Sequence, residues 1–60
     1  MTDKEMLKDA LEHEEEAIRL YRQYTEAVID ERIKEMFEQF AMNESWHASA
    51  LRDKLEHLEE

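Results

Sequence analysis

The sequence predicts an all-α protein, an antiparallel two-helix hairpin over residues 1–60 that dimerises into a four-helix bundle. Gly and Pro are both absent, and without these turn residues long helices are favoured over multi-stranded folds. Charged residues make up 42% of the chain, within a composition rich in strong helix formers. A chain this short buries a modest fraction of its surface, so a metal or a partner is expected to stabilise it.

The first predicted helix covers about residues 3–29. The run Thr2-Asp3-Lys4-Glu5 fits a capping box, in which the Thr2 hydroxyl accepts from the Glu5 amide and the Glu5 side chain reaches back. Apolar or small residues then recur with helical spacing. They are Leu7, Ala10, Leu11, Ala17, Ile18, Tyr21, Thr25 and Val28.

The second predicted helix covers about residues 31–58, with Asp30 as its N-cap and Glu31 in its first turn, where negative charge suits the helix dipole. Its apolar stripe consists of Ile33, Phe37, Phe40, Ala41, Ala48, Leu51, Leu55 and Leu58. So short a connection makes the helices antiparallel neighbours. Two helices cover only part of each stripe, so we expect a second copy to pack against the first with two-fold symmetry.

Charge and composition exclude several classes of protein. The formal net charge is −9, which disfavours bulk attraction to nucleic acid or to an anionic membrane and favours cations. No apolar run is long enough for a transmembrane helix or a signal peptide. The absence of Cys excludes disulfides and thiolate metal sites. We therefore expect a cytoplasmic protein without nucleic-acid or membrane partners.

Three polar residues, one in the first helix and two in the second, interrupt the apolar stripes near the middle of the helices. Glu14 lies within the first stripe, and Glu44 lies within the second, with His47 three residues later on the same side. Buried carboxylates need a compensating cation. A symmetric dimer would gather four carboxylates and two imidazoles, a donor set that suits two divalent ions of iron, manganese or zinc.

The spacing of Glu44 and His47 is weak evidence by itself, because 13 of the 60 residues are Glu. The helical phase is more informative, since both carboxylates fall on apolar faces at matching depth. A buried polar layer that fixes the register of a bundle, without metal, explains the same pattern and stays open as an alternative.

The segment from Glu14 to Tyr21 resembles the first ligand helix of rubrerythrins and other ferritin-like proteins, and the segment from Phe37 to Leu51, centred on Glu44-Ser45-Trp46-His47, resembles the second. The chain corresponds to half of a ferritin-like four-helix bundle, and in this respect it resembles the encapsulated ferritins. The thirty-residue interval between Glu14 and Glu44 is also similar to that group. The resemblance implies that Glu14, Glu44 and His47 are metal ligands and that Tyr21 lies close beyond them.

The function implied is a di-iron ferroxidase, which oxidises Fe(II) with O₂ or peroxide at a site shared by two chains, with two iron ions per dimer. Manganese and zinc remain alternative metals. A metal-binding or purely structural dimerisation module without turnover is the rival interpretation. Encapsulated ferritins carry a C-terminal tail that directs them into a protein shell, and nothing after Leu58 matches one. A shell or nanocompartment is thus expected only if a tail was removed.

Met42 and Trp46 lie one turn apart on the side of the second helix opposite Glu44. An apolar pair in that position indicates a second contact surface, through which dimers would form a higher homo-oligomer. Other candidates are assigned plainer roles. Tyr24 is expected to pack at the stripe edge, His57 to be solvated, and His13 with Glu16 to form no second metal site.

Overall fold

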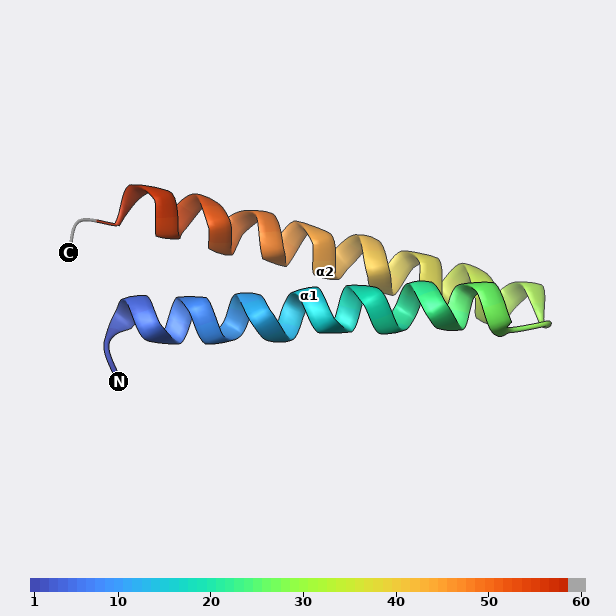
Figure 1. Cartoon of the computed structure of the whole chain (residues 1–60). Coiled ribbons are helices and arrows are strands. Elements are labelled where there is room, and N and C mark those ends of the chain that lie inside the picture. Colours follow the sequence, from blue (N-terminus) through green and yellow to red (C-terminus); the bar gives the residue numbers. More distant parts are fainter. Residues whose placement is uncertain (59–60) are drawn as a thin grey trace.

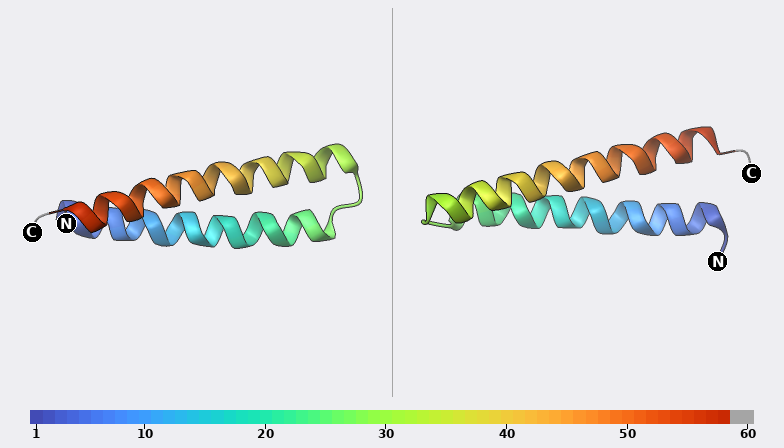
Figure 2. Two further views of the ribbon diagram at one scale, coloured as in Figure 1. Left: turned by 90° about the horizontal axis from the view of Figure 1, so that it is seen from above. Right: turned by 180° about the vertical axis from the view of Figure 1, so that it is seen from behind.

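A computed structural model describes residues 1–58 as two antiparallel helices, α1 (Asp3–Ala27) and α2 (Glu31–His57), joined by residues 28–30 (Figure 1). The hairpin measures 46 × 16 × 11 Å. The start of α1 and the end of α2 lie side by side, remote from the turn, as two further views show (Figure 2). The predicted all-α hairpin is confirmed. The expectation about a tail after Leu58 concerns residues outside the described range. Within residues 1–58, neither helix is long and apolar enough to cross a bilayer.

Side-chain caps start both helices, as predicted. Thr2 Oγ1 accepts from the Glu5 amide at 3.1 Å, and the Thr2 amide donates to Glu5 Oε1 at 2.9 Å, which completes the capping box. Asp30 Oδ1 accepts from the amides of Arg32 and Ile33 at 2.8 and 3.2 Å. These bonds satisfy amides that have no partner within the first turn of a helix.

The helix ends differ slightly from the predicted bounds. Helix α1 ends at Ala27, two residues before the predicted position 29, and α2 ends at His57 rather than Leu58. Val28 is extended (φ −72°, ψ 143°), although its N–H still donates to the Tyr24 carbonyl at 2.9 Å. Extended backbone is needed here because Asp30 must enter α2 as an N-cap. The sequence has no Gly at the end of α1, and the apolar periodicity continues to Val28, so the predicted helix extended beyond the observed one.

The core of the isolated hairpin is small. Among the described residues, the buried apolar side chains are Ile18, Ala41 and Ala48, and Ala48 is fully buried. Two alanines on one side of α2 let the helix backbones approach closely there. Near the turn, a cluster of four aromatic rings takes over the packing, with ring centroids 5.2–6.3 Å apart. Its members are Tyr21, Tyr24, Phe37 and Phe40.

Several large apolar side chains of the hairpin remain exposed. Its accessible surface is 4900 Å², whereas a compact monomer of 7.3 kDa exposes about 4200 Å². The excess, roughly 700 Å², reflects the elongated shape of two helices side by side. Ile33, Met36 and Phe40 are exposed and share one face of α2, since they are separated by three, four and seven residues. The hairpin therefore presents an apolar face, referred to below as the open face, that its own two helices do not cover.

Candidate metal centre

The structure brings Glu14, Glu44 and His47 together at the middle of the hairpin. Glu14 comes from α1, and the other two residues come from successive turns of α2. His47 Nδ1 lies 3.6 Å from Glu14 Oε2 and 3.6 Å from Glu44 Oε1. One donor atom from each of the three side chains lies within 4.8 Å of the others. The expectation that the two carboxylates sit at equal depth is therefore met.

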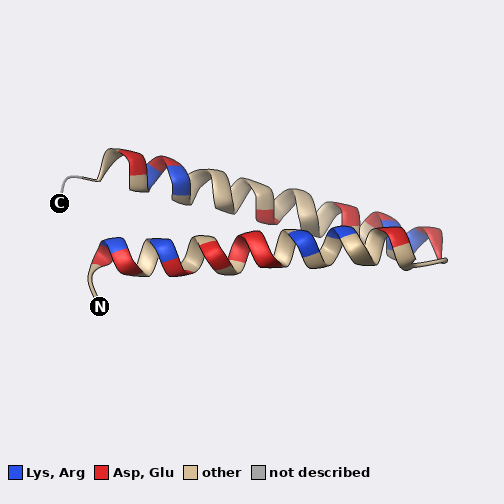
Figure 3. Ribbon diagram, viewed as in Figure 1, with Lys and Arg blue, Asp and Glu red and all other residues tan. Residues whose placement is uncertain are grey.

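Glu44 is an exception within its own helix. Residues 39–51 contain a single Asp, Glu, Lys or Arg, which is Glu44, in a chain that is 42% charged overall. Figure 3 shows this as one acidic band in the otherwise uncharged middle of α2. A carboxylate that is three-quarters buried is destabilising unless its surroundings compensate the charge. Its position thus indicates a requirement beyond solubility.

The site lies at the edge of the open face and is partly covered. The side chains of Glu14 and Glu44 are 24% and 25% exposed, whereas His47 is 62% exposed. Glu14 Oε2 is buried and has no hydrogen-bond partner. An unpartnered buried acceptor normally carries a desolvation penalty of about 1–3 kcal/mol. A proton on Glu44, a protonated His47 or a cation would relieve it.

The two carboxyl groups influence each other directly. A hydrogen bond with Glu14 raises the pKa of Glu44 above its usual value of 4.5, and partial burial and the negative charge of Glu14 act in the same direction. His47 opposes the shift. Two carboxylates this close favour sharing one proton when no cation is present. A bound cation would compete with a proton for these two carboxyl groups.

The donor set of Glu14, Glu44 and His47 could hold a metal ion. Two ligand atoms that are each about 2.1 Å from an ion are at most about 4.2 Å apart, and both His47 separations of 3.6 Å satisfy this limit. Carboxylate oxygen with imidazole nitrogen suits iron, manganese and zinc. Three protein ligands leave coordination positions for water or for groups of a second chain. A bound ion would also give Glu14 Oε2, which is buried without a hydrogen-bond partner, a positively charged neighbour.

Tyr21 contacts other aromatic rings rather than a carboxylate in the described part of the chain. Its ring stacks on Phe37 at 6.0 Å and meets Phe40 edge-on at 5.5 Å. Tyr24 contacts Phe37 at 5.2 Å, in agreement with its expected packing role. The placement of the Tyr21 hydroxyl near the metal ligands stays a prediction.

A second group, Asp53, Glu56 and His57, also gathers potential ligand atoms at the end of α2. His57 was expected to be solvated, and its side chain is indeed 69% exposed, 3.4 Å from Asp53 Oδ1. The available sequence signal was the four-residue spacing of Asp53 and His57, which places them on one face. Exposed acidic clusters are common without a metal, so we assign this group no binding role.

His13 pairs with Asp9 rather than with Glu16. Its ring lies 2.8 Å from the Asp9 carbonyl and 3.7 Å from the Asp9 carboxylate. The contact with the carbonyl, followed by the negative charge of Asp9, raises the pKa of His13. No metal-ligand group within residues 1–58 includes His13 or Glu16.

Comparison with known proteins supports the resemblance read from the two ligand helices. The family model described as Rubrerythrin matches residues 5–60. No curated protein and no solved structure matches this chain.

Proposed function

This chain belongs to the rubrerythrin family, and we propose that it is a ferroxidase whose two-iron site forms between two copies. Glu14, Glu44 and His47 of each copy would supply the ligands. The observation that carries the proposal is the meeting of these three side chains beside an open apolar face, with one carboxylate oxygen buried and unpartnered. A single hairpin contains half of the usual ligand set for two metals in such bundles.

The open face supports dimerisation. Covering it would bury Ile33, Met36 and Phe40, which are 41%, 43% and 38% exposed in one hairpin. Two-fold packing on this face would bring His47 of one copy and its equivalent in the other to the same level. Four helices and two sets of three ligands would then surround the two ions. Because each hairpin has so few buried residues of its own, this contact would supply much of the stability of the assembly.

Iron is the metal we assign, since rubrerythrin-family proteins typically use it and the donors are mainly hard carboxylates. Two Fe(II) ions are the substrate, and each loses one electron. O₂ takes up both electrons and two protons and leaves as H₂O₂. With H₂O₂ as the oxidant, the same two electrons and two protons yield two water molecules. Glu14 and Glu44 provide the negative charge that favours the ferric product.

The chain lacks Cys, so it contains no thiolate iron centre that could return electrons to the site. A peroxidase reaction sustained by an electron donor would require a donor centre outside residues 1–60. Oxidation of Fe(II) consumes electrons from the iron itself and needs no such donor centre. This difference favours iron oxidation over sustained peroxide reduction.

A second candidate is a dimerisation module that binds metal without turnover or binds none. The hydrogen bond with Glu14 that raises the pKa of Glu44 favours it, because hydrogen-bonded carboxyl groups form a polar layer that needs no metal. Manganese and zinc also suit the donors. These possibilities differ from a ferroxidase in oxygen consumption.

Anaerobic calorimetric titration with Fe(II) tests the site, and admission of air tests the reaction. We expect binding to reach a break at one Fe(II) per chain, since three ligands per chain are too few for two ions. One O₂ should then be consumed for every two Fe(II), measured with an oxygen electrode. A break at two Fe(II) per chain would contradict the shared site. Tight binding without oxygen uptake would favour the second candidate.

Matched substitutions locate the chemistry. Glu14→Ala, Glu44→Ala and His47→Ala should each abolish tight binding and iron oxidation, whereas their metal-free folds survive because all three side chains are partly exposed. His57→Ala is the control, since it removes a histidine from the exposed group at the end of α2. Undiminished oxidation by Glu44→Ala would place the site elsewhere.

A further inference from the structure

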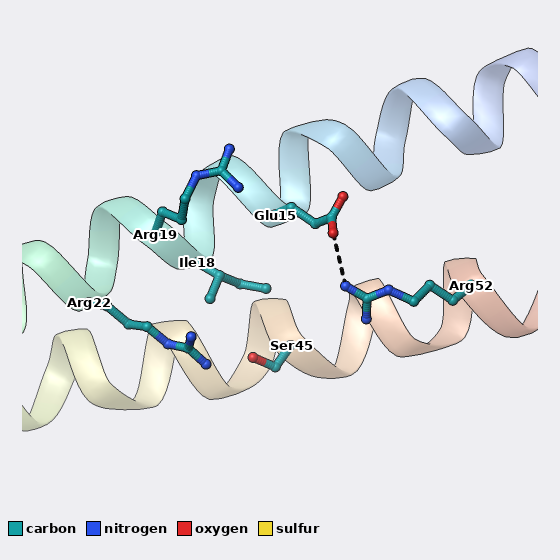
Figure 4. Close-up of a pocket in the computed structure, with 6 residues that line it drawn as sticks. All are labelled: Glu15, Ile18, Arg19, Arg22, Ser45 and Arg52. Atoms are coloured by element: carbon teal, nitrogen blue, oxygen red, sulfur yellow. Dashed lines mark hydrogen bonds and ion pairs between the residues drawn. The ribbon is translucent and has the colours of Figure 1, made fainter.

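A cluster of arginines lines a groove that shares no residue with the group of metal ligands. The groove, about 290 Å³ in volume, runs between α1 and α2 over Ile18. Its charged lining consists of Arg19, Arg22, Arg52 and Glu15 (Figure 4). Glu15 follows Glu14 directly, and consecutive helical residues point about 100° apart. A dimer formed through the open face would therefore leave this groove accessible.

The charge of the groove is opposite to that of the whole chain. Three guanidinium groups and one carboxylate give its lining a formal charge of +2, whereas the chain as a whole carries −9. Three of the eight Lys and Arg residues of the chain are gathered here. Such a local excess is the arrangement expected where an anion must be held against a repulsive background.

Two of these arginines lack a carboxylate partner. Within residues 1–58, neither Arg19 nor Arg22 has an ion pair within 4.0 Å, and the pair formed at the groove joins Arg52 to Glu15 at 3.1 Å. Figure 4 shows Arg22 extending from α1 toward α2 near Ser45, while Arg19 stays beside α1. The unpaired Arg22 thus already reaches over the groove from one helix.

Arg52 can supply a second guanidinium from the other helix. It lies seven residues after Ser45 on α2, a separation of about 10.5 Å along the helix axis. The side chains of Arg22, beside Ser45, and of Arg52 are long enough to hold one ligand between them across this distance. At rest its guanidinium is held by Glu15, but this pair is weak, since the side chains of Arg52 and Glu15 are 54% and 41% exposed. A doubly charged oxyanion would compete well with a single carboxylate.

We propose that this groove binds a small oxyanion of the phosphate class, held between the guanidinium groups of Arg22 and Arg52 with Arg19 at its rim. The planar guanidinium group pairs with phosphate oxygens through two parallel N–H bonds. Binding exchanges the Glu15–Arg52 pair for a phosphate–Arg52 pair. The adjoining groove shares Arg22 but carries two carboxylates, Glu26 and Glu38, so the positive region ends at Arg22. The site does not depend on the iron chemistry.

Titration of the full chain with inorganic phosphate tests the proposal. Chelator removes divalent metal, and chloride holds the ionic strength constant. Two-dimensional ¹H–¹⁵N NMR should show saturable shifts at the Arg22 side-chain Nε–H and the Ser45 amide. Arg22→Gln and Arg52→Gln should each weaken phosphate binding about tenfold, the worth of one charge-assisted contact. Glu15→Gln should strengthen binding by a factor of about 2–5, because the competing exposed ion pair is gone.

Stronger phosphate binding by Glu15→Gln could also come from the change in net charge alone, so a matched control is needed. Arg32→Gln removes one positive charge from the start of α2, where Arg32 lies 3.9 Å from Asp30, and should leave phosphate binding unchanged. Equal losses in Arg22→Gln and Arg32→Gln would overturn the proposal in favour of general charge screening. So would shifts that never saturate, or a change of oligomer mass in Arg22→Gln without any change in phosphate binding.

Discussion

Among the individual side chains, Glu44 differs from the other carboxyl groups of α2 because the Glu14 carboxyl faces it across the two helices. The hydrogen bond between them is the largest cause of the raised pKa of Glu44, ahead of burial and charge repulsion. The folded metal-free chain therefore holds the Glu44 proton more tightly than the unfolded chain does. Folding and protonation are coupled at this residue.

This coupling predicts the pH dependence of stability without metal. A raised folded pKa contributes stability that is fully present below the unfolded value, near 4.5, and is lost as the pH rises through the higher folded value. The contribution of Glu44 to the stability of the metal-free chain should thus grow as the pH falls from neutral toward 4.5. Glu44→Gln should remove this part of the dependence, measured as the difference in urea midpoint between the two proteins at each pH.

Glu38→Gln is the matched control, since Glu38 is exposed on the same helix. It should leave the pH dependence largely as it is in the parent chain. A Glu44→Gln protein with an unchanged pH profile would contradict the carboxyl pair as its source.

At the scale of single elements, each helix is defined by its capped start, while its end is marked only by extended residues. Asp30 has the more demanding position, because it closes the turn and starts α2 with two amide hydrogen bonds. If α2 began one residue later or unravelled at its start, its phase relative to α1 would loosen. The alignment of Glu44 with Glu14 depends on that phase.

Removal of this cap should therefore destabilise the hairpin. Asp30→Ala leaves the amides of Arg32 and Ile33 without their acceptor, and we expect a loss of about 1 kcal/mol. In a domain of this size that lowers Tm by about 4–8 °C, measurable by circular dichroism at fixed protein concentration. Asp30→Asn keeps a side-chain oxygen and should remain within a few tenths of the parent value. Equal losses in both variants would mean that the charge, not the cap, stabilises the turn.

At the scale of the whole molecule, the hairpin has too small a core for its exposed apolar surface. The open face and the acidic ligands lie side by side, so assembly and metal binding should be linked. Without metal, dimerisation through that face brings four carboxylates together, and they repel each other. A divalent ion relieves this repulsion.

Zn²⁺, which has no redox chemistry, should therefore shift sedimentation toward the dimer at a protein concentration where the metal-free chain is partly monomeric. His47→Ala should dimerise to the same extent with and without Zn²⁺, because it lacks one of the three ligands. An identical mass distribution of the parent chain with and without the ion, over a wide concentration range, would contradict the linkage.

A second surface concerns assemblies above the dimer. Trp46 and Met42 are 65% and 50% exposed, and they line a groove of about 500 Å³ away from the metal ligands. We expect a weaker contact between dimers centred on Trp46, as aromatic residues and Met are enriched at interfaces. Trp46→Glu should confine the chain to dimers at high concentration, measured by sedimentation, and leave iron oxidation per chain intact.

Gln23→Glu, which adds the same charge at an exposed position of α1, is the control and should not change the oligomer mass. Loss of the dimer or of iron oxidation in Trp46→Glu would mean that Trp46 faces the metal-binding interface.

The sequence by itself determined the features that depend on neighbours along the chain. Thr2 and Asp30 cap their helices through bonds to amides two or three residues away, and the apolar period gave the phase of Glu14 and Glu44. Only the tertiary structure decided how far the atoms of one helix lie from those of the other. The meeting of His47 with both carboxylates, the unpartnered Glu14 oxygen and the arginine groove all depend on the register between α1 and α2. That register is set by the extended turn and by close packing at Ala41 and Ala48, which no local pattern specifies.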